Sequence, residues 1–168
     1  MDHVRNRIAR VNGTLSDEAQ KRLDNLTKPQ GSLGRLEEFA GMVAAITGDK
    51  MPVLDKKVVF TFAGDHGVVN EGVSAYPNEV APQMVFNFLR GGAGINVLAR
   101  HAGADVVVID IGVDHDFGNV PGLVSRKVVR GTANMFKGPA MTRQQSEQCI
   151  QVGIDLAREY AGKGRIMQ

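Results

Sequence analysis

The sequence predicts an α/β fold built on a parallel sheet. Two short runs rich in β-branched and aromatic residues, 57–63 and 105–111, do not alternate polar and apolar side chains, which is typical of strands buried on both faces. A helical pattern over residues 81–101 separates them, and another follows over 143–161. Strands that alternate with helices favour right-handed crossovers and therefore a parallel sheet.

Two helices are expected before the sheet. The first covers residues 16–27 with Ser16 as its N-cap, and the second covers 33–47 with Ser32 as its N-cap. The face expected to be buried in the second helix consists of apolar residues at helical spacing: Leu33, Leu36, Phe39, Ala40, Val43 and Ile46.

The remaining elements lie toward the end of the chain. A short strand is expected at 125–129, and residues 142–145 match a capping box that opens the last helix. Residues 165–168 are expected to begin a further strand. The chain therefore divides into an N-terminal helical segment, 1–50, and an α/β part, 51–168.

The composition excludes several classes of protein. The formal net charge is +2, from 20 basic and 18 acidic residues, which is too even to indicate binding to nucleic acid or to a membrane surface. No run approaches the roughly 18 apolar residues of a membrane span, and the first residues do not resemble a signal peptide. The single cysteine, Cys149, is expected to be a small buried hydrophobe, and it fits a reducing compartment, so we expect a cytoplasmic protein.

Polar side chains follow both expected strands, at the edge where open α/β sheets bind ligands. Asp65 and His66 come directly after the first strand, between Gly64 and Gly67. A histidine there fits heterocycle binding, acid–base catalysis or metal ligation, and a simple polar turn is an equally good explanation. The two glycines favour a ligand-facing role because they let the backbone approach a ligand closely.

Three further patterns have a functional and a structural interpretation. Residues 114–116, Asp-His-Asp, are metal-ligand types, but their spacing matches no known loop motif, and a solvated acidic turn is favoured. The glycine-rich residues 91–94 precede a helix as phosphate-binding turns do, but they follow a helical segment, which favours a helix break. Tyr76, in the loop after the first strand, either stacks on an aromatic ligand or covers the core.

Several longer motifs resemble the nicotinate-nucleotide–dimethylbenzimidazole phosphoribosyltransferases. They occur in the order found in that family, from about residue 14 to the end of the chain, and together they are far more specific than a lone glycine pattern. They are residues 28–37 (Lys-Pro-Gln-Gly-Ser-Leu-Gly-Arg-Leu-Glu), 63–68 (Ala-Gly-Asp-His-Gly-Val), 71–77 (Glu-Gly-Val-Ser-Ala-Tyr-Pro), 102–112, 130–134 (Arg-Gly-Thr-Ala-Asn) and 138–141 (Gly-Pro-Ala-Met).

The resemblance implies a fold and a reaction. Family members have a Rossmann-like large domain and a small helical domain, so the N-terminal helices here would belong to the small domain and the parallel sheet would be an incomplete Rossmann-like sheet. The family transfers phosphoribose from nicotinate mononucleotide to 5,6-dimethylbenzimidazole, with inversion at the anomeric carbon. The products are α-ribazole 5′-phosphate and nicotinate, and the former supplies the lower ligand of cobalamin. The resemblance further implies a homodimer and no metal or redox cofactor.

The resemblance also implies a site. It places the benzimidazole pocket at the loop around Tyr76, bordered by Asp65 and His66. The expected substrate-binding residues are Asp65, His66, Ser74, Tyr76, Gln83 and Met84. Some members have serine at the position of Tyr76 and glutamine at that of Met84, and the adjacent Gln83 would point about 100° away on a helix.

The family's glycine-rich nucleotide-binding segment and its catalytic glutamate correspond to sequence after residue 168. No catalytic residue is therefore assigned within this chain, which is expected to be an incomplete fragment of the enzyme. One alternative is a non-catalytic module that binds benzimidazole-like heterocycles. Another is a metal-dependent hydrolase that uses Asp65, His66, Asp114 and His115.

Overall fold

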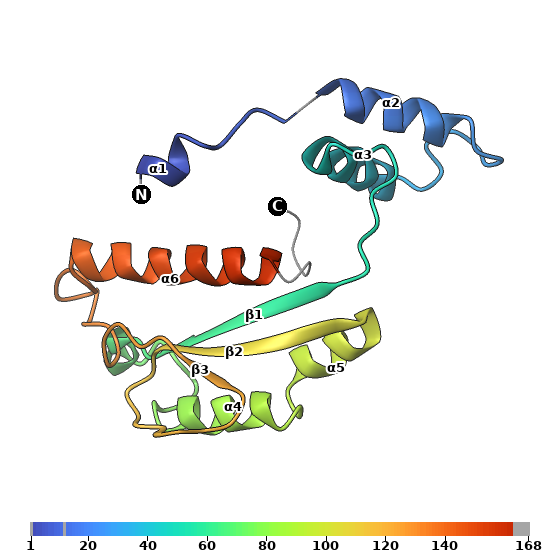
Figure 1. Cartoon of the computed structure of the whole chain (residues 1–168). Helices are drawn as coiled ribbons and strands as arrows, with labels where there is room; N and C mark the ends of the chain where they lie inside the picture. The colour runs from blue at the N-terminus through green and yellow to red at the C-terminus, as the bar shows by residue number, and fades with distance from the viewer. Residues whose placement is uncertain (1, 12, 163–168) are drawn as a thin grey trace. The chain divides into compact units, whose positions relative to one another are not determined.

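A computed structural model describes residues 2–11 and 13–162, and the chain separates into two compact units, one up to Asp55 and one from Lys56 onward (Figure 1). The first unit contains α1 (Asp2–Arg5), α2 (Gly13–Asp24) and α3 (Arg35–Thr47). The second contains β1 (Lys57–Gly64), η1 (Gly67–Glu71), α4 (Val80–Leu89), α5 (Gly94–Ala102), β2 (Ala104–Gly112), β3 (Leu123–Ser125) and α6 (Arg143–Gly162). Among the described residues, no helix is both long and apolar enough to cross a membrane.

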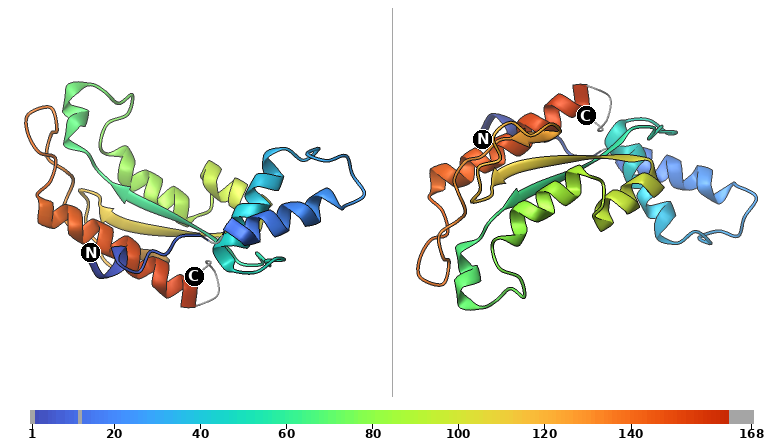
Figure 2. Two further views of the ribbon diagram at one scale, coloured as in Figure 1. Left: turned by 90° about the horizontal axis from the view of Figure 1, so that it is seen from above. Right: turned by 90° about the horizontal axis from the view of Figure 1, so that it is seen from below.

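The second unit confirms the expected parallel α/β sheet. Its three strands lie in the order β1-β2-β3, and both pairings are parallel. Helix α6 covers one face of the sheet and α4 and α5 cover the other (Figure 2). The core joins Val85 of α4 to Val108 and Val113, with Phe88 and Leu123 packed against them.

The two expected strands differ in burial. In β2 the consecutive residues Val108, Ile109 and Asp110 are all buried, as expected for a strand covered on both faces. The same expectation is wrong for β1, where Phe62 is exposed and Val59 and Phe60 are only half-buried. The reason is its position, because among the described residues β1 is an edge strand of the sheet, whereas β2 is the central one.

The glycines at 91–94 form the favoured helix break between α4 and α5. Gly91 has a φ of +76°, and a Cβ on Gly92 would lie 2.4 Å from the side-chain oxygen of Asn87. The buried Asn96 completes the turn, since its Oδ1 accepts the N–H of Ala93 and its Nδ2 donates to the carbonyl of Phe88. The positive φ of Gly91 and the close side chain of Asn87 at Gly92 explain these two glycines without a ligand.

Three element ends differ from expectation. Helix α2 begins at Gly13, so Ser16 lies inside it and is not its N-cap. Helix α3 begins at Arg35, and its N-cap position is Gly34, with a φ of 55°, so Ser32 is not the cap. Strand β3 is Leu123–Ser125, although the 126 and 128 amides still donate to β2 carbonyls. The strand expected at 165–168 lies outside the described residues.

The capping box of α6 is confirmed. The Thr142 hydroxyl accepts the N–H of Gln145 at 3.2 Å, and the Gln145 side chain accepts the N–H of Thr142 at 2.8 Å. Both bonds satisfy amides that a helix N-terminus leaves without a partner in the helix itself. Cys149, further along the same helix, is half-buried, so its expected full burial is wrong.

Glu37 holds together the turn between α2 and α3. It is 4% exposed, and its carboxylate accepts hydrogen bonds from Lys28 Nζ at 2.8 Å and from the Leu33 N–H at 3.0 Å. The Lys28 ammonium and then the Leu33 N–H hold the pKa of the Glu37 carboxyl below its ordinary value. Residues 28–37, the first motif of the resemblance, therefore make up one closed loop.

The lowered pKa of Glu37 predicts a pH-dependent stability of this unit. Since the folded pKa is lowered, the stabilisation is fully present above the ordinary value of about 4.5 and is lost as the pH falls through the folded value. We expect Glu37→Gln to melt α2 and α3 several degrees lower than the wild type at neutral pH, and the difference to shrink below pH about 4.5.

Amide NMR signals of residues 13–47, followed against temperature at several pH values, measure this difference. Glu38→Gln is the control, because Glu38 is exposed and its oxygen lies 3.8 Å from Arg35. A gap between wild type and Glu37→Gln that stays constant with pH would contradict the prediction.

The buried face of α3 is not the one that the apolar pattern predicts. Leu36, Phe39 and Ile46 are 65%, 48% and 51% exposed, whereas Gly41, Ala44 and Ala45 are buried. The small residues allow α2 to approach closely: a Cβ on Gly41 would lie 2.9 Å from Ser16 Oγ. Leu36 and Phe39 instead line an open groove of about 560 Å³ within this unit, together with Leu23, Val43 and residues 50–54.

Candidate functional site

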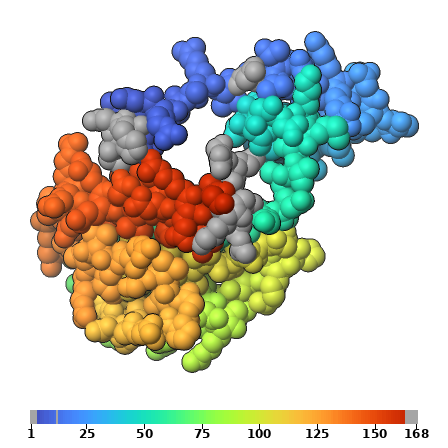
Figure 3. All heavy atoms as spheres, viewed as in Figure 1, coloured from blue at the N-terminus to red at the C-terminus, as the bar shows by residue number. Residues whose placement is uncertain are grey.

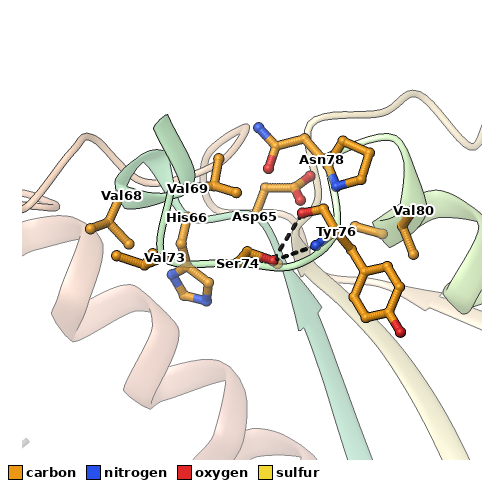
Figure 4. A pocket seen from close by; sticks show the side chains of 12 residues that line it. Asp65, His66, Val68, Val69, Val73, Ser74, Tyr76, Asn78 and Val80 are labelled. Carbon is orange, nitrogen blue, oxygen red and sulfur yellow. Dashed lines mark hydrogen bonds between the residues drawn. The ribbon is translucent and has the colours of Figure 1, made fainter. Parts of the chain in front are cut away.

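A pocket of about 340 Å³ opens at the C-terminal end of β1, between η1 and the first turn of α4 (Figure 4). This is the edge of a parallel sheet at which ligands are expected. Its apolar walls are Val68, Val69, Val73, Pro77, Val80 and Ala81, and its polar lining residues are Asp65, His66, Ser74, Tyr76 and Asn78.

The structure brings four of the six expected site residues together here. Asp65, His66, Ser74 and Tyr76 all line the pocket. Gln83 and Met84 do not, because α4 begins at Val80 and presents its first turn to the pocket, while positions 83 and 84 are exposed further along the helix.

Asp65 connects the ends of β1 and β2. Its side chain is buried, and Oδ2 accepts the N–H of Asp114 at 2.8 Å. Its own N–H donates to the Gly112 carbonyl at 3.1 Å, and its carbonyl accepts the N–H of Thr132 at 2.9 Å. The carboxylate is therefore part of the scaffold of the pocket as well as of its lining.

A segment that we call the strap, residues 130–134, crosses the ends of both strands. Gly131 donates to the Gly112 carbonyl at 2.9 Å, and the N–H of Gly67 donates to the Thr132 carbonyl at 3.1 Å, so that His66 pairs in parallel with Thr132. The chain around the strap, orange in Figure 3, and the first turn of α6 together line a second hollow of about 470 Å³. Sequence reasoning recognised this motif but did not predict its contacts.

His66 and the loop after it form the ligand-facing side. His66 is exposed in an extended conformation, and Figure 4 shows its imidazole and the Tyr76 ring on either side of Ser74. The Ser74 hydroxyl accepts the N–H of Tyr76 at 3.1 Å and donates to its carbonyl at 2.9 Å. Tyr76 is 69% exposed, so it is free to stack on a ligand and does not cover the core.

The Asp-His-Asp segment forms a surface turn. The Asp116 carboxylate accepts the N–H of Gly118 at 3.0 Å and lies 3.6 Å from Arg130, and His115 packs edge-on against Phe117. Within the described residues, no group of three or more His, Cys, Asp or Glu side chains is arranged to hold a metal ion.

Lys127, which sequence reasoning missed, holds the turn that Asp65 contacts. Its ammonium lies 2.9 Å from the Asp110 carboxylate, which is 2% exposed, and it donates to the carbonyls of Val113 and His115. Asp110 also accepts the N–H of Val113 at 3.0 Å. These bonds fix the turn at 113–115, whose central amide is the one bound by Asp65.

Comparison with known proteins identifies the family of the chain. The profile of the phosphoribosyltransferase family matches residues 8–167. A nicotinate-nucleotide–dimethylbenzimidazole phosphoribosyltransferase from Geobacter sulfurreducens is 66% identical over 94% of this chain and 45% of its own length. One of the same name from Geotalea uraniireducens is 60% identical over 96% of this chain and 46% of its own.

A solved structure leads to the same family. The crystal structure of such an enzyme from Thermus thermophilus superposes with a TM-score of 0.84 at 48% identity, covering 91% of this chain and 46% of its own. The chain thus spans somewhat under half the length of the relatives it matches. Since the family profile covers nearly all of its residues, the chain belongs to the phosphoribosyltransferase family.

Proposed function

We propose that this chain is part of an enzyme that transfers phosphoribose from nicotinate mononucleotide to 5,6-dimethylbenzimidazole, and that the pocket at β1 takes the benzimidazole. The observation that carries the proposal is the 66% identity, over 94% of the chain, to a relative named for this reaction. The products would be α-ribazole 5′-phosphate and nicotinate.

The chemistry of the pocket supports this assignment. A dimethylbenzimidazole is flat and mostly apolar, which suits walls of valine, proline and alanine. Its ring nitrogens need hydrogen-bond partners, and the His66 imidazole and the Asn78 amide are two of the lining groups able to donate and to accept. Tyr76 supplies an exposed ring against which the base can stack.

The domain assignment, the localisation and the oligomeric state belong to the same proposal. We assign residues 1–50 to a small helical domain and 51–168 to a Rossmann-like large domain; the division between compact units at Asp55 and Lys56 lies close to this boundary. We further propose that the full-length protein is cytoplasmic and forms a homodimer. Light scattering of the purified protein measures its mass and so tests the dimer.

Calorimetric titration of the 168-residue chain with 5,6-dimethylbenzimidazole tests the pocket. We expect binding, and we expect Tyr76→Ala to weaken it about 3- to 10-fold, which corresponds to one aromatic contact of about 0.5–1.5 kcal/mol. Phe136→Ala is the control, since Phe136 is 76% exposed and does not line the pocket. No binding at millimolar ligand would rule out the assignment.

Turnover separates the enzyme from its main alternative. Of the described residues that line the pocket, only Asp65 carries a carboxylate, and its Oδ2 already accepts the Asp114 N–H, so we expect the 168-residue chain alone to bind without turnover. The longest native polypeptide that contains this chain should convert both substrates. If that polypeptide binds the base without converting it, the chain is a non-catalytic heterocycle-binding module.

A further inference from the structure

Two segments far apart in the sequence meet at Glu71, the last residue of η1. The Asn134 side chain donates from Nδ2 to Glu71 Oε1 at 2.6 Å, and Lys137 Nζ lies 3.8 Å from the same oxygen. Neither Glu71 nor Asn134 lines the pocket. The contact therefore joins the end of the strap to the segment that leads into the pocket loop.

Asn134 is itself held in one orientation. Its Oδ1 accepts the N–H of Phe136 at 3.0 Å, and its carbonyl accepts the N–H of Lys137 at 3.0 Å. On the other side, Ala133 donates to the Ala140 carbonyl at 2.8 Å. Because Oδ1 is engaged by its own turn, only the Nδ2 end of the amide is presented to Glu71.

The loop that begins after Glu71 carries the ligand-facing side chains. Gly72, with a φ of 73°, redirects the chain, and residues 73–79 are all exposed. The Ser74–Tyr76 hydrogen bonds lie within the loop, so they shape it without tying it to the sheet. The Glu71–Asn134 bond connects the start of the loop to the strap; it is short and exposed to solvent, and its acceptor is a carboxylate.

We propose that Glu71 is a positioning residue, which sets the affinity of the pocket for its aromatic base by fixing the loop of Val73, Ser74 and Tyr76 through Asn134. The inference rests on the proposed function for the identity of the ligand. The fixing of the loop is independent of the proposed function and can be measured in the protein without ligand.

A swap of donor and acceptor tests the bond in the 168-residue chain, with 5,6-dimethylbenzimidazole as the probe. We expect Glu71→Ala to weaken binding about 10-fold, because the loss of a charge-assisted hydrogen bond releases the loop. Asn134→Asp keeps the acceptor for the Phe136 N–H but sets two carboxylates against each other, and should weaken binding at least as much. Adding Glu71→Gln to Asn134→Asp restores a donor–acceptor pair and should return affinity to within about threefold of wild type.

A second measurement is independent of the ligand. Hydrogen exchange of the Gly72 and Tyr76 amides should be about tenfold faster in Glu71→Ala and in Asn134→Asp, normal in the swapped pair, and unchanged at Ile109 in β2. Glu147→Ala, which removes an exposed acid on α6, is the control for both measurements.

The outcomes separate the two proposals. Failure of the wild-type chain to bind the base would overturn the proposed function. Hydrogen exchange would still test whether Glu71 fixes the loop. Unchanged exchange at Gly72 and Tyr76 in Glu71→Ala, or no rescue by the swapped pair, would overturn the positioning role whether or not the base binds.

Discussion

Replacing Lys127 by methionine is expected to lower the free energy of unfolding by about 3–5 kcal/mol. The substitution leaves the carboxylate of Asp110, 2% exposed, without its cation. It also removes the donor to the carbonyls of Val113 and His115. A buried charge that loses its partner is among the most costly changes in a protein interior, because no opposite charge then compensates for the hydration lost on burial.

Chemical denaturation followed by tyrosine fluorescence measures the Lys127→Met effect, since Tyr76 and Tyr160 both lie in the second unit. Arg143→Met is the matched control at the exposed Arg143–Glu147 pair and should cost less than about 0.5 kcal/mol. Adding Asp110→Asn to Lys127→Met should recover most of the stability, because the amide oxygen still accepts the Val113 N–H. Equal losses for Lys127→Met and Arg143→Met would contradict the prediction.

Gly67→Ala is expected to destabilise the second unit by about 1–3 kcal/mol and to displace the strap. A Cβ at this position would lie 2.7 Å from three backbone atoms of the strap, those of Thr132, Ala133 and Asn134. Backbone cannot rotate away as a flexible side chain does, so the strap must shift and the Gly67–Thr132 hydrogen bond must lengthen.

The control for Gly67→Ala is Gly138→Ala, which lies shortly after the strap in the sequence. Nothing lies within 4 Å of a Cβ on Gly138, and its φ is not positive, so alanine there should be neutral or slightly stabilising. Denaturation midpoints of the two variants decide the point: similar midpoints would mean that the strap does not pack on Gly67 in solution.

The sequence predicted the sheet and the edge at which a pocket lies because those features leave local signals. The apolar runs at β1 and β2 and the helices between them are periodic patterns, and Asp65 and His66 follow from the rule that parallel strands present their C-terminal ends to ligands. The capping box at Thr142 is equally local, which is why it was predicted correctly.

The contacts that build the pocket leave no such signal. Asn134 and Glu71 are 63 residues apart, and the pairs Lys127–Asp110 and Asp65–Asp114 also depend on how loops cross the end of the sheet. Nothing in the spacing of these residues distinguishes them from surface charges. The apolar pattern of α3 failed for another reason, because it identifies which face is apolar and not which face a neighbour covers.

The arrangement of α3 has a consequence for how this helix tolerates mutation. Its hydrophobic positions and its sterically constrained positions are different sets. Polar replacements at Phe39 or Ile46 should leave the α2–α3 contact intact, whereas a methyl group added at Gly41 would force the Ser16 hydroxyl to move. A ranking of variants by hydropathy alone would therefore misjudge this helix. It would treat the exposed apolar residues as essential and the buried small residues as tolerant of substitution.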